Sequence, residues 1–190
     1  FFLNTYGSLY AVTKKNMNLK WFVNLNESID INPSNLFLGN QIVNNDKKIV
    51  VGTSQFTFIV DAETGSILYK KNFNSIVKPI IIDKYFFTIS KNNFLIATNI
   101  NDGTIVYSLD INQKIADFLK SKKKEVQIKN MMILNNNIFI FLKNSFVLKF
   151  NLNGKLKDID KLPNKLNSFP IIFNKSMVYF DFKNRLTVVN

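Results

Sequence analysis

Short runs of apolar residues separated by polar turn residues extend along the whole chain, and residues 78–109 show this pattern most clearly. Runs rich in Ile, Phe, Tyr and Thr occupy 78–82, 85–90, 94–98 and 104–109, with Asn, Asp, Lys and Gly between them. Branched and aromatic side chains favour extended backbone, and such short links are typical of hairpins. The segment therefore predicts four antiparallel strands, each paired with the next.

The pattern recurs in other parts of the chain. Residues 55–69 align with residues 93–107 without a gap, so that a turn glycine and a final aromatic residue coincide in both segments. Three more segments align with these two at the end of the third strand. The five equivalent positions, spaced 38 to 52 residues apart, are Thr13, Asp61, Asn99, Asn151 and Asn190. A four-stranded unit that recurs about every 40 residues is typical of a β-propeller blade.

We therefore expect an all-β fold, a β-propeller of four-stranded antiparallel blades. The repeat units are predicted at approximately 1–28, 36–75, 77–111, 128–165 and 167–190, with a helical insertion at approximately 112–125. The first and last units contain three strands each, which gives about four to five blades. Because a closed ring needs a complete terminal blade, we predict that residues 1–190 form one partial domain of a seven- or eight-bladed propeller.

Glycine occupies the turn before the last strand in three copies, at Gly65, Gly103 and Gly154. Such turns commonly require a positive φ, which glycine adopts without the steric penalty of a Cβ atom. The first copy has Met17 at this position. We expect the turn of the first copy to have a different shape.

The segment between the third and fourth units interrupts the repeat and has helical periodicity. Asn112 is the expected N-cap, and the lysines of 120–124 are expected to stabilise the C-terminal end of the helix. We hypothesise that this insertion contributes to a protein–protein surface. The candidate partner-binding residues are Ile115, Phe118, Leu119, Lys122, Lys123 and Lys124. In the alternative interpretation, Ile115 and Phe118 only cover the end of the propeller, and the lysines are solvated.

The composition removes most kinds of catalytic site. The 190 residues include no cysteine and no histidine, which excludes thiolate metal sites, cysteine nucleophiles and histidine bases. Asp158 and Asp160 lack the six or more converging oxygen ligands that calcium prefers. We therefore predict no catalytic, cofactor-binding or metal-binding residues.

The formal net charge of +12 raises the question of a nucleic-acid partner. The lysines are scattered apart from 122–124, and they do not alternate with aromatic residues as in proteins that bind single strands. No apolar run approaches the ~20 residues of a membrane-spanning helix. We predict neither a nucleic-acid partner nor a membrane-spanning segment in this chain.

The repeated pattern resembles the tryptophan-docking motif of PQQ-like (quinoprotein-type) β-propellers, Ala-x-Asp-x-x-Thr-Gly-x-x-x-Trp, and the resemblance covers essentially the whole chain. Ala11 and Ala97 match its alanine, and Trp21 matches its tryptophan. The resemblance implies that these aromatic residues and turn glycines are structural anchors between blades. The expected anchors are Trp21, Gly65, Tyr69, Gly103, Tyr107 and Gly154.

Two functional classes share this repeat. Quinoprotein dehydrogenases hold PQQ and calcium with acidic and amide side chains, whereas BamB-type propellers are non-enzymatic scaffolds of outer-membrane β-barrel assembly. The absence of cysteine and the small number of acidic residues, 13, favour the scaffold class. The resemblance then implies a bacterial, periplasmic, lipid-anchored scaffold without a cofactor, whose protein partners include the barrel assembly complex. The alternative is a fragment of a PQQ- and calcium-dependent dehydrogenase.

Overall fold

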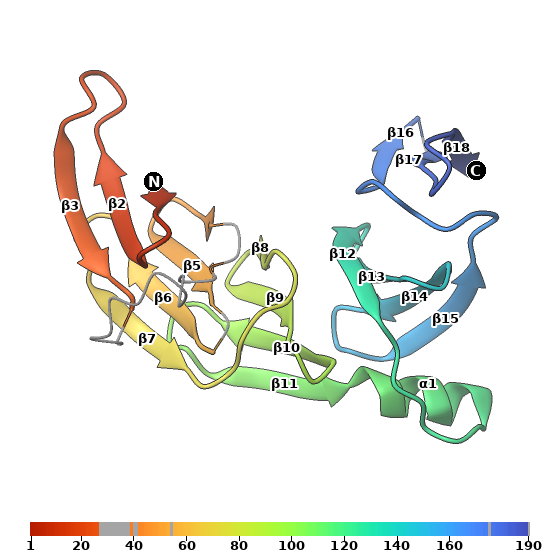
Figure 1. The fold of residues 1–190 in the computed structure, drawn as a ribbon. Coiled ribbons are helices and arrows are strands. Elements are labelled where there is room, and N and C mark those ends of the chain that lie inside the picture. Colours follow the sequence, from red (N-terminus) through yellow and green to blue (C-terminus); the bar gives the residue numbers. More distant parts are fainter. Residues whose placement is uncertain (27–38, 40–41, 54, 175, 190) are drawn as a thin grey trace. The chain divides into compact units, whose positions relative to one another are not determined.

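The structure is a computed structural model that describes residues 1–26, 39, 42–53, 55–174 and 176–189. The chain forms two compact units, 1–109 and 110–190. Over the described ranges it contains five antiparallel sheets, in each of which the strands follow one another in chain order, and one helix. The prediction of an all-β fold built from propeller blades is confirmed (Figure 1).

Among the described residues, the unit 1–109 contains three sheets. The first sheet comprises β1 (Phe2–Leu3), β2 (Ser8–Val12) and β3 (Leu19–Asn24). The second comprises β4 (Val43–Asn44), β5 (Lys48–Gly52), β6 (Thr57–Asp61) and β7 (Ile67–Lys71). The third comprises β8 (Ile80–Ile82), β9 (Tyr85–Ile89), β10 (Phe94–Asn99) and β11 (Ile105–Asp110).

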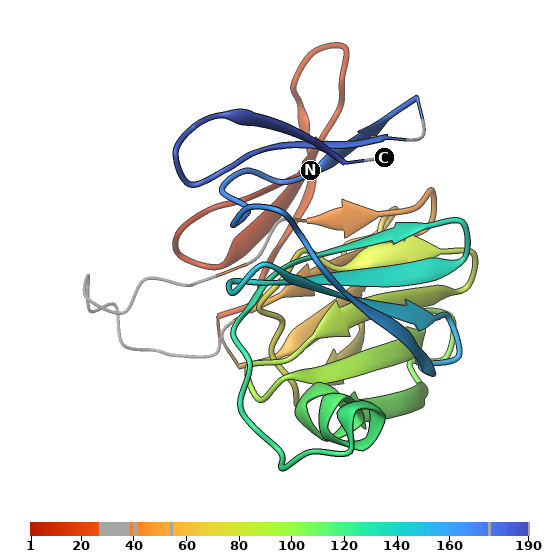
Figure 2. The ribbon, with the colours of Figure 1, turned by 90° about the vertical axis from the view of Figure 1, so that its right-hand side faces the viewer.

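The unit 110–190 begins with α1 (Ile111–Leu119), from which the chain returns to the next strand (Figure 2). The fourth sheet comprises β12 (Ile128–Leu134), β13 (Asn137–Leu142), β14 (Phe146–Asn151) and β15 (Leu156–Lys161). The fifth comprises β16 (Ile171–Phe173), β17 (Ser176–Phe180) and β18 (Leu186–Val189).

The second sheet is buried on both faces, which explains why its central strands are apolar without alternation. Ile49 and Val51 pack with Phe58 and Leu9 in a cluster between the first and second sheets. Val50, which points to the opposite face of β5, packs in another cluster that includes Phe86 of the third sheet. Successive side chains of a strand point to opposite faces, so a strand between two sheets needs apolar residues at both parities.

The unit 110–190 has a core of its own. Phe141 and Val147 of the fourth sheet are buried together with Tyr179 of the fifth sheet. Leu162 and Leu166, from the connection between these sheets, complete the cluster. Burying such side chains stabilises the unit by roughly 1.5–3 kcal/mol each.

In the first copy, the turn between β2 and β3 has the same shape as the turn between β6 and β7 in the second copy, although Met17 replaces the glycine. The amide N–H of Met17 donates to the carbonyl of Thr13 over 2.9 Å, as that of Gly65 donates to Asp61 over 3.0 Å. Met17 has a φ of 56°, in the left-handed region. The expectation of a different turn in the first copy was therefore wrong. The methionine side chain is 69% exposed, so the turn accommodates it without a clash and carries only the local cost of the left-handed backbone.

Candidate functional site

Trp21, on β3, lies against the turn between β6 and β7 of the neighbouring sheet. A Cβ atom at Gly65 would lie 2.6 Å from both Cδ2 and Cε3 of the indole. The indole Nε1 donates a hydrogen bond to the carbonyl oxygen of Ala62 over 3.3 Å. The ring is thus held against the backbone of this turn, where only a glycine leaves enough room.

Tyr69, on β7, makes the equivalent contact with the third sheet. A Cβ atom at Gly103 would lie 2.7 Å from its Cγ, and its hydroxyl donates to the carbonyl oxygen of Asn101 over 3.0 Å. Gly65 and Gly103 have φ values of 78° and 69°. In both places the aromatic ring packs against protein and donates its polar hydrogen to a backbone carbonyl, which is the chemistry of a packing contact.

Tyr107 and Gly154 occupy the corresponding positions of later copies. Tyr107 lies on β11, and burial raises the pKa of its hydroxyl above the ordinary value. Gly154 lies in the turn between β14 and β15 with a φ of 81°, and its N–H donates to the carbonyl of Asn151 over 3.0 Å. The two residues belong to different compact units.

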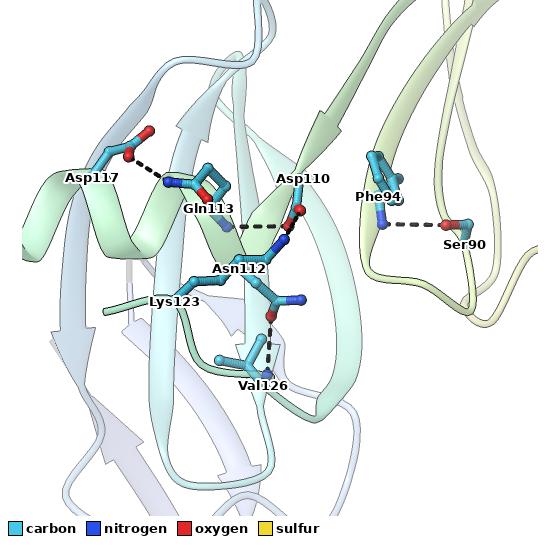
Figure 3. A network of polar contacts seen from close by, with 8 residues as sticks. All are labelled: Ser90, Phe94, Asp110, Asn112, Gln113, Asp117, Lys123 and Val126. Atoms are coloured by element: carbon cyan, nitrogen blue, oxygen red, sulfur yellow. Dashed lines mark hydrogen bonds and ion pairs between the residues drawn. The ribbon is translucent and has the colours of Figure 1, made fainter. Parts of the chain in front are cut away.

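The N-cap of α1 lies two residues earlier than expected, at Asp110. Its Oδ1 accepts from the amide of Gln113 over 3.1 Å (Figure 3). The prediction of Asn112 as N-cap was wrong. Asn112 lies inside the first turn, buried, and its Oδ1 accepts from the amide of Val126 over 3.0 Å. This bond attaches the end of the insertion to the start of its helix.

The helix ends at Leu119 and does not include the lysines of 122–124. Lys120 adopts the left-handed conformation, φ 49° and ψ 44°, and the amide of Ser121 donates to the carbonyl of Ala116 over 2.9 Å. This is the geometry that terminates many helices. The predicted helical insertion over 112–125 is thus a helix over 111–119 followed by a loop, and no basic residue lies in its last turn.

Lys123 returns to the N-terminal end of α1, where its Nζ lies 2.5 Å from Oδ2 of Asp110 (Figure 3). Burial raises the pKa of the Asp110 carboxyl, but hydrogen bonds from Lys123 and from the amide of Gln113 outweigh this effect. The net pKa of Asp110 therefore lies below its ordinary value. Two contacts attach the loop after the helix to the N-terminal end of α1: this ion pair and the hydrogen bond between Asn112 and Val126.

Two apolar side chains of α1 face solvent. Phe118 is 45% exposed and Leu119 is 54% exposed, whereas Ile111 and Ala116 are buried and Ile115 is half-buried. The first residues of the helix and Ala116 are thus buried against protein, whereas its C-terminal end leaves Phe118 and Leu119 accessible. The exposed lysines that follow them in the chain, Lys120, Lys122 and Lys124, supply positive charge. We refer to Phe118, Leu119, Lys120, Lys122 and Lys124 as the insertion surface.

The insertion surface offers apolar contact and positive charge, which suits binding of a partner. In the part of the chain that the structure describes, no group of three or more Asp, Glu, His or Cys residues is placed to hold a metal ion. Within the same residues, no helix has the length and hydropathy required to cross a membrane.

No protein-family model and no curated protein matches this sequence. Among solved structures, BamB from Moraxella catarrhalis is similar over 98% of this chain and 67% of that chain, with 10% identity and a TM-score of 0.50. A protein of unknown function from Bacteroides caccae is similar over 97% and 69%, with 13% identity and a TM-score of 0.55. The computationally designed Ika4 protein is similar over 78% and 89%, with 12% identity and a TM-score of 0.55. These likenesses concern the fold, and at a coarse level they identify a BamB-like β-propeller.

Proposed function

We propose that this protein is a non-catalytic scaffold that binds protein partners, as a BamB-like component of the machinery that assembles outer-membrane β-barrel proteins. The sequence resemblance and the BamB-like fold support this class. A fold alone does not define a function, so the proposal depends on a surface of this chain. The observation that carries it is the insertion surface, a helix outside the repeat that exposes Phe118 and Leu119 beside several lysines.

The construction of the insertion supports a binding role. Its loop is closed by the ion pair between Lys123 and Asp110 and by the hydrogen bond between Asn112 and Val126. A surface held in one conformation loses less conformational entropy when a partner binds. Aromatic side chains are also enriched at the centre of protein interfaces, and nearby lysines favour association with an acidic partner. The expected partner surface combines an apolar pocket with acidic residues.

The location is part of the same proposal. A scaffold of the barrel assembly machinery works in the periplasm at the inner surface of the outer membrane, and BamB-type proteins are attached there through a lipid on the N-terminus. We propose this location for the whole protein. A lipid-modified N-terminal peptide, detected by mass spectrometry of protein isolated from its native membranes, would test it.

The test of the partner surface uses Phe118→Ala and the double substitution Lys122→Glu/Lys124→Glu. Lys123 is left unchanged, because its ion pair with Asp110 closes the loop. The matched controls are Phe169→Ala, a phenylalanine that is 55% exposed outside the insertion, and Lys155→Glu/Lys157→Glu beside the turn of the fourth sheet. Binding to the purified barrel assembly complex of the same organism is measured by surface plasmon resonance.

We expect each insertion variant to bind at least about tenfold more weakly and the controls to bind normally. Equal binding by all variants, with circular dichroism showing intact folding, would remove the insertion surface from the proposal. A scaffold that shows no binding at all to barrel assembly proteins is not BamB-like in function. Turnover of alcohols or sugars after addition of PQQ and calcium would contradict the non-catalytic class.

A further inference from the structure

A hollow of about 530 Å³ opens in the unit 1–109, on the side of the second and third sheets where the turns between their second and third strands lie. It is separate from the insertion surface, and no residue of α1 lines it. Its lining comes from five parts of the chain: the turn at Gln55, the segment 72–74 after β7, the turn 90–92, and strands β10 and β11. The volume lies within the range of ligand-binding pockets, about 300–1,000 Å³.

The floor of the hollow is apolar and continuous with the core. Phe73 packs against the buried cluster between the second and third sheets, and Ile96 is only 4% exposed. Phe94 is half-buried beside them, and Ile105, which is 49% exposed, extends the apolar lining toward solvent. Such a floor favours an apolar group, because a polar group buried there without a partner would lose its hydration.

The rim carries side-chain amides and hydroxyls. Gln55, Asn72, Asn74 and Asn92 each bring a primary amide, which combines a hydrogen-bond donor and an acceptor in one plane. The Oδ1 atom of Asn74 accepts from the backbone amide of Lys91 over 2.8 Å, which fixes the segment after β7 to the turn between β9 and β10. Two of the segments that line the hollow are therefore held together before any ligand arrives.

The charge of the lining is positive. Among the described residues that line the hollow, Lys91 carries the one charge, and none of them is a carboxylate. Its ammonium group would attract a ligand with an acidic group and repel a cationic one. The hollow thus combines an apolar floor, amides at the rim and a single positive charge.

We propose that this hollow binds an extended peptide segment, which places an apolar side chain over Phe73 and Phe94 and pairs its main-chain groups with the amides of the rim. A peptide group presents one donor and one acceptor, which match a primary amide. Extended peptides are recognised in this way, with hydrogen bonds to the main chain and a pocket for a side chain. A saccharide fits less well, because its hydroxyls would lie against Ile96 and Ile105 without partners.

The segment is acidic or neutral. Lys91 lines the hollow and is exposed, so its ammonium group is available to a carboxylate beside the apolar side chain of the peptide. This site would give the scaffold a second point of contact with a partner, independent of the insertion surface. The proposal does not require the first surface to bind, and each surface can be disabled without the other.

The test titrates the ¹⁵N-labelled chain with the blocked peptide Ac-Gly-Phe-Gly-Asp-Gly-NH₂ and follows backbone amide shifts. The comparison peptides replace Phe by Ser or Asp by Lys, and maltotriose is the saccharide probe. Ser108→Trp fills the hollow from β11, and its control is Val106→Trp, at an exposed position of the same strand that does not line the hollow. Lys91→Glu tests the charge, with Lys84→Glu as its control.

We expect the Phe peptide to shift the amides of Lys91, Asn92 and Ser108, and the Ser and Lys peptides to bind about tenfold more weakly. Ser108→Trp should abolish the shifts and Lys91→Glu should weaken binding severalfold, while both controls bind normally. Equal shifts with the Phe and Ser peptides would overturn the proposal. So would shifts with maltotriose alone, which would assign a saccharide site, or the absence of shifts with every peptide. None of these outcomes depends on the insertion surface.

Discussion

The indole of Trp21 lies so close to Gly65 of the neighbouring sheet that a Cβ atom there would be 2.6 Å from two atoms of the ring. The contact joins the last strand of one copy, β3, to the turn between β6 and β7 of the next copy. Tyr69 and Gly103 make the same contact between the second and third sheets. The recurrent aromatic and the recurrent glycine of the sequence are therefore two halves of one contact, although they come from different copies.

Gly65→Ala should lower the free energy of unfolding by roughly 2–5 kcal/mol. The new Cβ atom would displace the Trp21 ring, which costs about 1–3 kcal/mol, and alanine in the left-handed region costs about 1–2 kcal/mol more. Urea unfolding followed by far-UV circular dichroism measures the change, because this signal does not depend on Trp21, the one tryptophan of the chain.

The matched control for this prediction repeats Gly65→Ala in a Trp21→Leu background. If the clash with the ring is responsible, the same substitution should cost less there, because leucine can move away from the new methyl group. An undiminished loss of stability would show that only the backbone conformation matters at residue 65. Gly103→Ala should behave as Gly65→Ala does, through the ring of Tyr69.

The repeat made most of the fold predictable from the sequence. In the third unit, the strands expected at 85–90 and 94–98 are β9 (Tyr85–Ile89) and β10 (Phe94–Asn99), so their bounds differ by one residue. Alignment of the copies supplied information that no single copy contains. This reasoning does not detect an exchange of residues that leaves the backbone unchanged. Met17 is the example: its side chain suggested another turn, but its backbone bond to Thr13 is the same as the bonds that Gly65 and Gly103 make in their copies.

Met17→Gly should stabilise the protein by about 0.5–1 kcal/mol. Glycine removes the steric cost of a left-handed φ, about 1–2 kcal/mol, but increases the conformational entropy of the unfolded chain. Thermal unfolding by calorimetry measures the difference. Lys15→Gly, in the same turn but without a positive φ, should have the opposite effect, and stabilisation by both substitutions would contradict the explanation.

Asp110→Ala should destabilise the unit 110–190 by about 1 kcal/mol, because it removes the side chain that caps α1. Asp110→Asn keeps a capping oxygen but removes the charge that pairs with Lys123, so it should cost less than the alanine substitution. Urea unfolding by circular dichroism compares the two variants with Asp117→Ala, an exposed residue further along the helix. Equal stability of Asp110→Ala and the wild type would contradict the assignment of the cap.

The fifth sheet should lose stability in acid through Asp181. Hydrogen bonds from the Arg185 side chain, at 2.7 and 2.9 Å, and from the backbone amides of Arg185 and Lys183 hold the pKa of this carboxyl below its ordinary value. A carboxyl with a lowered pKa in the folded state stabilises the protein above the unfolded pKa, about 4. This contribution is lost as the pH falls from there through the lowered pKa.

The measurement compares urea unfolding at about pH 6 and about pH 3. In Asp181→Asn the loss of stability between these two conditions should be smaller than in the wild type, since the variant has no proton to gain at this position. Asp158→Asn, on an exposed strand of the fourth sheet, serves as the control. A loss as large in Asp181→Asn as in the wild type would remove this residue as a cause of acid sensitivity.

The candidate sites were less predictable than the fold, for physical reasons. The sequence located the insertion, but it did not show whether Asp110 or Asn112 is the N-cap of the helix, because that depends on the residue at which the backbone becomes helical. The pairing of Lys123 with Asp110 joins residues on either side of the helix, and no local pattern encodes it. The hollow around Phe94 is formed by loops from separate parts of the chain, and Asn, Ser and Gln in such loops look like ordinary turn residues.

The contact between an aromatic residue and the glycine of the following copy also bears on how such a chain can change in evolution. Each junction depends only on two adjacent copies, Trp21 with Gly65 and Tyr69 with Gly103. If the second copy, about 40 residues, were deleted, Trp21 would be followed by a copy whose turn also carries a glycine, Gly103. A change in the number of copies is therefore compatible with this contact, because the glycine and the aromatic residue that form it come from two different blades.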